Sequence, residues 1–130
     1  MIVLDTQVMV FDVLEPKRLS RRAKQALAEG TESRNLACSD ISLWEIAMLI
    51  ARRKLEAEGG AAAFINDILQ GRYIRVLPIT PEIAVMAQAD VFRQRDPADR
   101  IIAATALERG IPLVTADAEL RKLRGLKVVW

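Results

Sequence analysis

Four acidic residues are spaced so that folding could bring them to one site. They are Asp5 at the end of MIVLD, Glu45 in SLWEIAML, Asp99 in DPADRIIAATAL, and Asp117 directly after IPLVTA. Two like charges ~4 Å apart repel by about 1 kcal/mol in water and about 4 kcal/mol at an effective dielectric constant of roughly 20. A hard divalent cation removes this repulsion, and Mg²⁺ and Mn²⁺ prefer oxygen ligands. Such a site is suited to phosphodiester hydrolysis.

Each acid also has a structural interpretation as a helix cap. In DPAD, Asp96 can be the N-cap, with a proline and a second aspartate in the first turn. Ser42 and Glu45 match the capping box S-x-x-E. Asp117 can cap a short helix that follows it. Asp5 has the weakest capping interpretation, because it ends a buried strand. For each acid taken singly, the sequence does not distinguish a capping role from a catalytic role.

The composition narrows the chemistry that is available. The 130-residue chain has no histidine and one cysteine, Cys38, which excludes Ser-His-Asp and Cys-His triads and disfavours a structural zinc site. With 52% apolar residues, 28% charged residues and a net charge of +2, we expect one globular domain over residues 1–130. The mild basicity permits a polyanionic partner. The lone cysteine and the lack of a bilayer-length apolar run predict a cytoplasmic protein without a membrane partner.

The elements that must position the acids alternate between strands and helices. A helix or turn is expected at 6–14. Gly30 is expected to end the helix that begins at Ser20, and 31–35 to form a loop. The other predicted elements are strands at 1–5, 36–39, 73–79, 111–116 and 126–130, and helices at 42–55, between Gly59 and Gly71, and at 80–94, 96–110 and 117–123. This alternation predicts an α/β fold with a central, mostly parallel sheet of four to five strands and helices on both faces.

The predicted topology places the acids together. In an open parallel sheet the carboxyl ends of the strands share one edge, and ligands bind there. Asp5, Glu45 and Asp117 follow the first, second and fourth predicted strands, at that edge. Asp99 begins a helix that runs back antiparallel to the strands, and such helices also start at that edge. We therefore expect all four carboxylates to converge.

The motifs MIVLDT, SLWEIAML, DPADRIIAATAL and PLVTAD, in this order and spacing, resemble those of PIN-domain nucleases, and most closely those of the VapC toxins of toxin–antitoxin pairs. The resemblance covers essentially the whole chain. It implies a three-layer α/β/α PIN-like fold and a Mg²⁺- or Mn²⁺-dependent endoribonuclease. A metal-activated water would cleave RNA, leaving a 5′-phosphate and a 3′-hydroxyl. It also implies a homodimer and a cognate VapB-like antitoxin, whose C-terminal segment lies across the site.

The same resemblance assigns roles to particular residues. Asp96 is either a metal ligand, directly or through water, or only a cap. Arg100 is expected to orient a carboxylate or to meet a phosphate. The chain departs from common relatives at Gln7 and Gln94, where histidine is frequent. The catalytic and metal-binding acids are Asp5, Glu45, Asp99 and Asp117, with supporting hydroxyls on Thr6 and Thr115.

Two segments carry more apolar residues than one buried face needs. Trp44 and Met48, four residues apart, form a second apolar stripe on their predicted helix. Near the amino end, Val10, Phe11 and Val13 form a similar excess. Either these helices are wedged between other elements or they form protein interfaces. The resemblance favours interfaces for both, and most of the basic clusters are interpreted as solvated helix faces.

Two alternatives to a toxin remain. The first is a housekeeping RNA-processing nuclease of the same family, which would lack a neighbouring reading frame for an antitoxin. The second is a protein-binding module on the same fold, in which the acids serve only as caps. Aspartate-to-asparagine substitutions separate site from cap, because asparagine keeps most of the capping ability.

Overall fold

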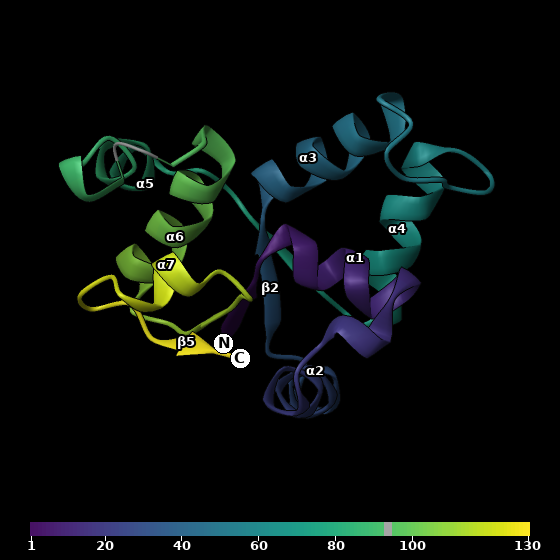
Figure 1. Ribbon diagram of the computed structural model, residues 1–130, viewed down its shortest axis with the longest axis horizontal. Coiled ribbons are helices and arrows are strands. Elements are labelled where there is room, and N and C mark those ends of the chain that lie inside the picture. Colours follow the sequence, from purple (N-terminus) through teal and green to yellow (C-terminus); the bar gives the residue numbers. More distant parts are fainter. Residues whose placement is uncertain (93–94) are drawn as a thin grey trace.

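A central sheet of five parallel strands organises the protein. The computed structural model describes residues 1–92 and 95–130, and the strand order is β3-β2-β1-β4-β5 (Figure 1). The strands are short and parallel, so their carboxyl ends lie along the same edge of the sheet. They are β1 (Ile2–Leu4), β2 (Leu36–Ser39), β3 (Arg75–Leu77), β4 (Leu113–Val114) and β5 (Val128–Val129).

Helices cover both faces of this sheet and make a three-layer α/β/α fold, which confirms the predicted fold class (Figure 1). One face carries α1 (Thr6–Leu14), α2 (Arg21–Ser33), α3 (Asp40–Ala51) and α4 (Ala61–Gly71). The other carries α5 (Pro81–Met86), α6 (Pro97–Arg109) and α7 (Ala118–Arg121). Short 3₁₀ turns, η1 (Pro16–Arg18) and η2 (Asp90–Phe92), complete the described elements.

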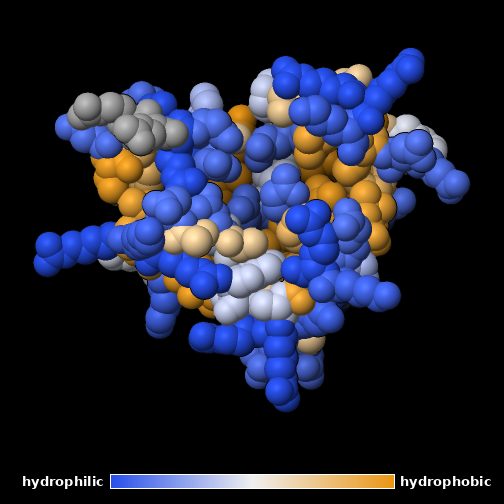
Figure 2. All heavy atoms as spheres, in the orientation of Figure 1, coloured by the Kyte–Doolittle hydropathy of each residue, from blue (hydrophilic) through white to orange (hydrophobic). Residues whose placement is uncertain are grey.

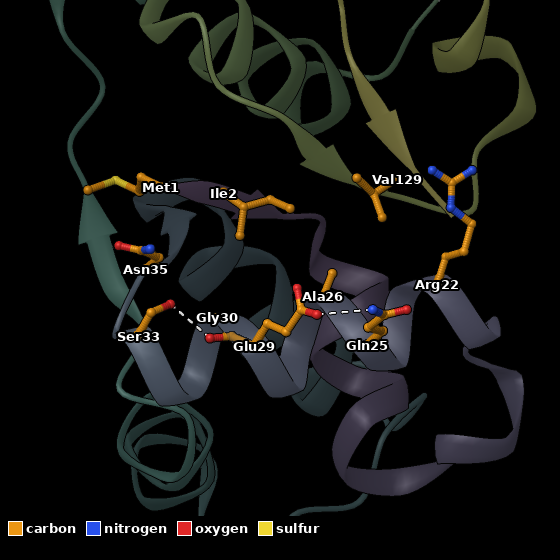
Figure 3. Close-up of a pocket in the computed structure, with 10 residues that line it drawn as sticks. All are labelled: Met1, Ile2, Arg22, Gln25, Ala26, Glu29, Gly30, Ser33, Asn35 and Val129. Carbon is orange, nitrogen blue, oxygen red and sulfur yellow. Dashed lines mark hydrogen bonds between the residues drawn. The ribbon is translucent and has the colours of Figure 1, made fainter.

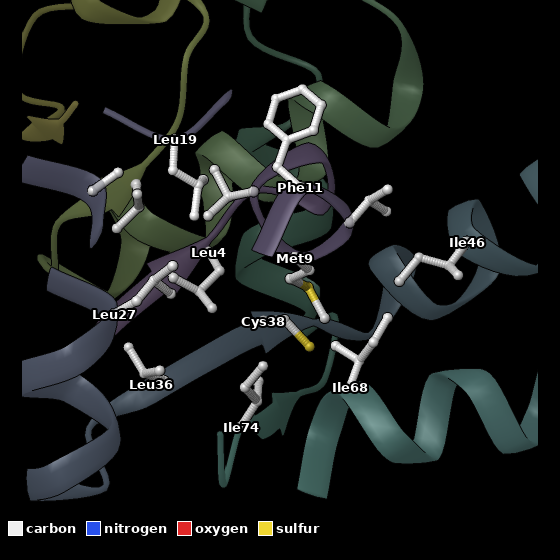
Figure 4. Close-up of a cluster of buried hydrophobic side chains, with 14 of the residues drawn as sticks. Leu4, Met9, Phe11, Leu19, Leu27, Leu36, Cys38, Ile46, Ile68 and Ile74 are labelled. Carbon is white, nitrogen blue, oxygen red and sulfur yellow. The ribbon is translucent and has the colours of Figure 1, made fainter. Parts of the chain in front are cut away.

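Two hydrophobic cores lie on opposite sides of the sheet because side chains alternate along each strand. Leu4 and Cys38 point into the core beneath α1 to α4 (Figure 4), whereas Val3 and Ala37 point into the core beneath α5 to α7. All four are at most 1% exposed. Burying a leucine or valine side chain contributes about 1.5–3 kcal/mol, so both cores hold β1 firmly in the middle of the sheet.

The helix after Ser20 is longer than predicted. It passes through Gly30 and ends at Ser33, with Arg34 as a left-handed C-cap (φ 55°). A Cβ atom on Gly30 would lie 2.2 Å from Cδ2 of the buried Leu36. Glycine is therefore required for the close approach of α2 to β2, and the prediction that it ends the helix before a 31–35 loop is wrong.

Other predicted boundaries were too wide. The predicted strand 73–79 contracts to β3, because Tyr73 adopts a left-handed backbone conformation (φ 54°). The predicted helix 80–94 begins as expected, with Thr80 as N-cap, but α5 ends at Met86 and η2 follows. Its last residues, 93 and 94, lie outside the described part of the chain. Among the described residues, each helix is too short or too polar to cross a bilayer.

Candidate active site

The predicted acids line one cleft at the carboxyl edge of the sheet. Asp5 directly follows β1, Glu45 lies in α3 after β2, and Asp117 follows β4. Asp99, in the first turn of α6, lines the same cleft together with Asp96. Figure 2 shows hydrophilic side chains gathered in a hollow between the α6 and α3 sides of the molecule. The convergence predicted from topology is present.

Asp5 is the most deeply buried of these acids, at 9% exposed. It occupies the N-cap position of α1, but its side chain makes no capping hydrogen bond. Its Oδ2 instead accepts a hydrogen bond of 2.7 Å from the buried Thr115 hydroxyl. Burial raises the pKa of Asp5, and the hydrogen bond from Thr115 only partly opposes that shift. The position of Asp5 thus favours a role in a site over a role as a cap.

Glu45 is oriented by a hydroxyl network rather than by a capping box. Oγ1 of Thr6 donates a hydrogen bond of 2.5 Å to Oε1 of Glu45 and lies 2.9 Å from Oγ of the buried Ser42. The N-cap of α3 is Ser39, whose Oγ accepts from the amide of Ile41 at 3.2 Å. The capping-box interpretation of Ser42 and Glu45 is therefore wrong, because α3 begins earlier than predicted. Burial raises the pKa of Glu45.

Asp96 caps a helix and also lies in a group of acids with Asp99. Asp96 is the N-cap of α6, as predicted, and its Oδ1 accepts from the amide of Asp99 at 2.9 Å. One carboxylate oxygen from each of Glu45, Asp96 and Asp99 also lies within 4.8 Å of the others. Burial, followed by the negative charges of Asp96 and Asp5, raises the pKa of Asp99 to about 7. Mutual repulsion within this group is the condition that a bound cation relieves.

Asp117 has a different environment from the other acids. Its carboxylate accepts hydrogen bonds from the Arg95 guanidinium at 2.5 and 3.2 Å, and from the amides of Glu119 and Leu120 at 2.9 and 3.3 Å. Burial alone would raise the pKa of Asp117, but these hydrogen bonds and the Arg95 charge outweigh it and hold the pKa below its ordinary value. Asp117 therefore caps α7, as predicted, and also lines the cleft.

The comparison with known families now decides the assignment. A model of the PIN domain matches residues 2–126. The chain belongs to the PIN-domain family. This PIN domain is similar to Ribonuclease VapC22 of Mycobacterium tuberculosis, with 36% identity over 124 residues, which is 95% of this chain and 92% of that protein.

Solved structures share the fold of this PIN domain. One is VapBC2 from Rickettsia felis bound to a DNA fragment from its promoter, with a TM-score of 0.74, 17% identity, and coverage of 98% of this chain and 97% of that chain. Another is DNA-bound VapBC from Salmonella typhimurium, with a TM-score of 0.73, 22% identity, and coverage of 98% and 95%. These likenesses confirm the predicted fold family.

Among the described residues of this PIN domain, Arg100 donates to groups after α5 and not to the acids, so the prediction that it orients a carboxylate is wrong, and a contact with a phosphate stays a prediction. Its Nε donates to the carbonyl of Ala87 at 2.9 Å, and a terminal nitrogen donates to Oε1 of Gln88 at 2.9 Å. Both acceptors directly follow α5. The reason is helical geometry, because residues adjacent in sequence on a helix do not share a face, and Asp99 takes the face toward the cleft.

Arg95 is the residue at the acids that sequence reasoning missed. Its pairing with Asp117 joins residues 22 apart in sequence. The position of an arginine just before the DPAD motif was the available signal. Of the two departures from common relatives, Gln7 lines the cleft, and Gln94 lies outside the described residues, as does Arg93.

The predicted interface residues divide into two groups. Trp44, at 60% exposed, and Met48 line an apolar groove that adjoins Glu45 and Asp96. They remain candidates for a partner surface. Phe11 is 8% exposed and packs into the first core, so its assignment as an exposed interface residue is wrong.

A second pocket lies away from the acids, beside α2 and the amino ends of β1 and β2 (Figure 3). Its Glu29 side chain accepts a hydrogen bond of 3.0 Å from Gln25 in the same helix, and the carbonyl of Glu29 accepts from Ser33 at 2.8 Å. These polar groups serve α2 itself. The carboxylate-rich cleft is therefore the better candidate for chemistry.

Proposed function

We propose that this PIN domain, as one domain over residues 1–130, is the toxin of a VapBC-like pair and acts in the cytoplasm as a Mg²⁺- or Mn²⁺-dependent endoribonuclease. The observation that carries the proposal is the grouping of the Glu45, Asp96 and Asp99 carboxylates within 4.8 Å, in the cleft that also contains Asp5. The similarity to a protein named as a VapC ribonuclease supports the reaction class.

The donor set fits a hard divalent cation. The ligand atoms that Glu45, Asp96 and Asp99 offer are carboxylate oxygens, which suit Mg²⁺ and Mn²⁺ better than zinc. We propose that Asp5, Glu45 and Asp99 hold the cation. Asp96 would join them, because one of its carboxylate oxygens lies in the same group, and Asp117 lines the same cleft. When bound, the cation lowers the pKa of a water and neutralises charge on the phosphate.

The residues around the acids prepare them for this task. The Thr115 and Thr6 hydroxyls donate to Asp5 and Glu45, which fixes the orientation of both carboxylates before a ligand arrives. Arg95 keeps Asp117 ionised. The partial burial of Glu45 and Asp99 reduces screening by water, so charges in the cleft interact more strongly than at an open surface.

The direct test is cleavage of a labelled RNA pool by the purified protein. We expect cleavage with Mg²⁺ or Mn²⁺, none with EDTA, and products that carry a 5′-phosphate and a 3′-hydroxyl. If there is neither cleavage nor a cation-induced rise in melting temperature, the proposal is wrong and the acidic cleft is not a catalytic metal site. If there is cleavage but no antitoxin in a neighbouring reading frame, the protein is instead a housekeeping RNA-processing nuclease.

We also propose that a VapB-like antitoxin and a second copy of this chain bind the protein. The groove lined by Trp44 and Met48 supports a partner surface, because an exposed tryptophan next to a functional cleft is costly to leave in water.

The Thr115→Val substitution is expected to weaken cation affinity and RNA cleavage by about 10- to 100-fold, as is usual for residues that orient metal ligands. Thr115 is fully buried, donates to Asp5, and accepts from the amide of Asp117 at 3.1 Å. Isothermal calorimetry with Mn²⁺ measures the affinity. Thr105→Val is the matched control, because the buried Thr105 hydroxyl donates to the carbonyl of Ile101 within α6. Equal losses in both variants would assign the effect to general destabilisation.

A further inference from the structure

An RNA strand that enters this cleft meets an excess of negative charge. Among the residues that the structure describes, five carboxylates and one arginine, Arg18, line it. Arg95 is not part of that lining. Its guanidinium nitrogens already form an ion pair with the Asp117 carboxylate oxygens at 2.5 and 3.2 Å. A bound divalent cation compensates part of the acid charge, but the phosphates on either side of the cleaved bond still need a positive partner. Arg18 is in a position to supply it.

The Arg18 side chain is held over an aromatic ring at the edge of the cleft. Its Cζ lies 4.2 Å from the centroid of Phe11, which also lines the cleft. Phe11 is 8% exposed and belongs to the first core, so this platform is rigid. A cation–π contact orients the guanidinium before a ligand binds, and less side-chain entropy is then lost on binding.

The Arg18 charge is otherwise nearly free to bind a ligand. Its guanidinium lies 3.8 Å from the carboxylate of Glu15, and both side chains are 59% exposed. Exposed pairs of this kind contribute little and break readily when a better partner arrives. A phosphate is a better partner, because the planar guanidinium donates two parallel hydrogen bonds to it.

The distance along α1 defines which phosphate Arg18 can reach. Phe11 lies six residues after Asp5, which is about 9 Å along a helix at 1.5 Å per residue. The ring on which Arg18 stacks is therefore set apart from Asp5, so Arg18 is suited to a phosphate beside the reacting one. We propose that Arg18, stacked on Phe11, binds a backbone phosphate that flanks the cleaved bond, and that it is an RNA-binding residue of this cleft. This inference rests on the proposed ribonuclease function.

The test measures RNA binding without cleavage. A fluorescein-labelled single-stranded RNA of mixed sequence is titrated with Asp99→Asn protein in Mg²⁺, over about 50 to 200 mM salt. Adding Arg18→Gln is expected to lower the slope of log affinity against log salt by about 0.7, the value for one phosphate contact on a single strand. Affinity at the lowest salt is expected to fall about tenfold, as for loss of one charge-assisted hydrogen bond.

Two further variants make the result specific. Arg34→Gln is the matched control, because the Arg34 guanidinium stacks at 4.1 Å on Tyr73, outside the cleft, and its removal is expected to leave the slope unchanged. Arg18→Lys keeps the charge and is expected to restore the slope but not the full affinity. In the cleavage assay, Arg18→Gln is expected to raise KM more than it lowers kcat.

The possible outcomes separate the two proposals. If the Asp99→Asn protein binds the RNA and Arg18→Gln changes neither slope nor affinity, the role of Arg18 is wrong and the nuclease proposal stands. If Arg18→Gln and Arg34→Gln lower the slope equally, binding is diffuse and the specific role of Arg18 is again wrong. If neither the Asp99→Asn protein nor the wild-type protein binds the RNA in Mg²⁺, both proposals fail.

Discussion

Replacing Asp99 with asparagine is expected to lower RNA cleavage by more than about 100-fold. Substituting a residue that only hydrogen-bonds to a metal ligand already lowers metal affinity or activity by about 10- to 100-fold. The fold should survive. The backbone amide of Asp99 is capped by Asp96, and asparagine has nearly the same shape as aspartate. In EDTA near neutral pH the variant is expected to melt higher than the wild type, because it removes one of three crowded charges.

The matched control for this substitution is Asp67→Asn, because Asp67 is an exposed acid on α4 and is not among the residues that line the cleft. It should cleave RNA at the wild-type rate and melt at the wild-type temperature. The decisive pair of measurements is initial cleavage rate in Mn²⁺ and melting temperature in EDTA. An Asp99→Asn protein that is folded and fully active would show that Asp99 has no part in the reaction.

Stability without a cation is expected to fall as the pH rises from about 4 to about 7. Folding raises the pKa of Asp99 from its ordinary value of 3.8 to about 7, so the folded state holds a proton that the unfolded state has lost. The stabilising contribution is complete below the ordinary pKa and disappears as the pH passes the folded-state pKa. The raised pKa values of Asp5 and Glu45 act in the same direction. Asp117, whose pKa is lowered, loses its contribution only in more acidic solution.

A divalent cation is expected to reverse this loss. At a free concentration of about 100 times its dissociation constant, a ligand stabilises the folded state by about 2.7 kcal/mol. For a chain of this length that is a rise of about 10 °C in melting temperature. Thermal scans across this pH range, with EDTA and with Mn²⁺, measure both effects, and Asp99→Asn should reduce both. A flat pH profile in EDTA would show that the acids are not crowded in solution.

The convergence of the acids was predictable because it depends on topology alone. Alternating strands and helices fix a parallel sheet, and residues that follow its strands must share one edge, wherever the exact boundaries fall. The positions of Asp5 and Asp117 therefore followed from two apolar runs. The cap formed by Asp96 was predictable for a similar reason, since it involves residues only three apart.

The features that sequence reasoning missed depend on contacts between distant residues. Gly30 has the sequence signature of a helix end, but α2 continues to Ser33, and the missing Cβ of Gly30 instead leaves room for the distant Leu36. The pairing of Arg95 with Asp117 crosses from the loop before α6 to the start of α7. Ser42 looked like a cap because the serine that caps α3, Ser39, is also the last residue of β2.

The order in which the strands are synthesised determines when the cleft can assemble. Of the five strands, β1 is synthesised first, but it lies in the centre of the sheet between β2 and β4. The cleft combines Glu45, from a helix that covers the first core, with Asp99, from a helix that covers the second. A nascent chain on the ribosome therefore lacks the assembled cleft until β4 and Asp117 have emerged. Under the proposed ribonuclease function, we expect fragments released by an interrupted round of translation to lack cleavage activity toward the RNA around them.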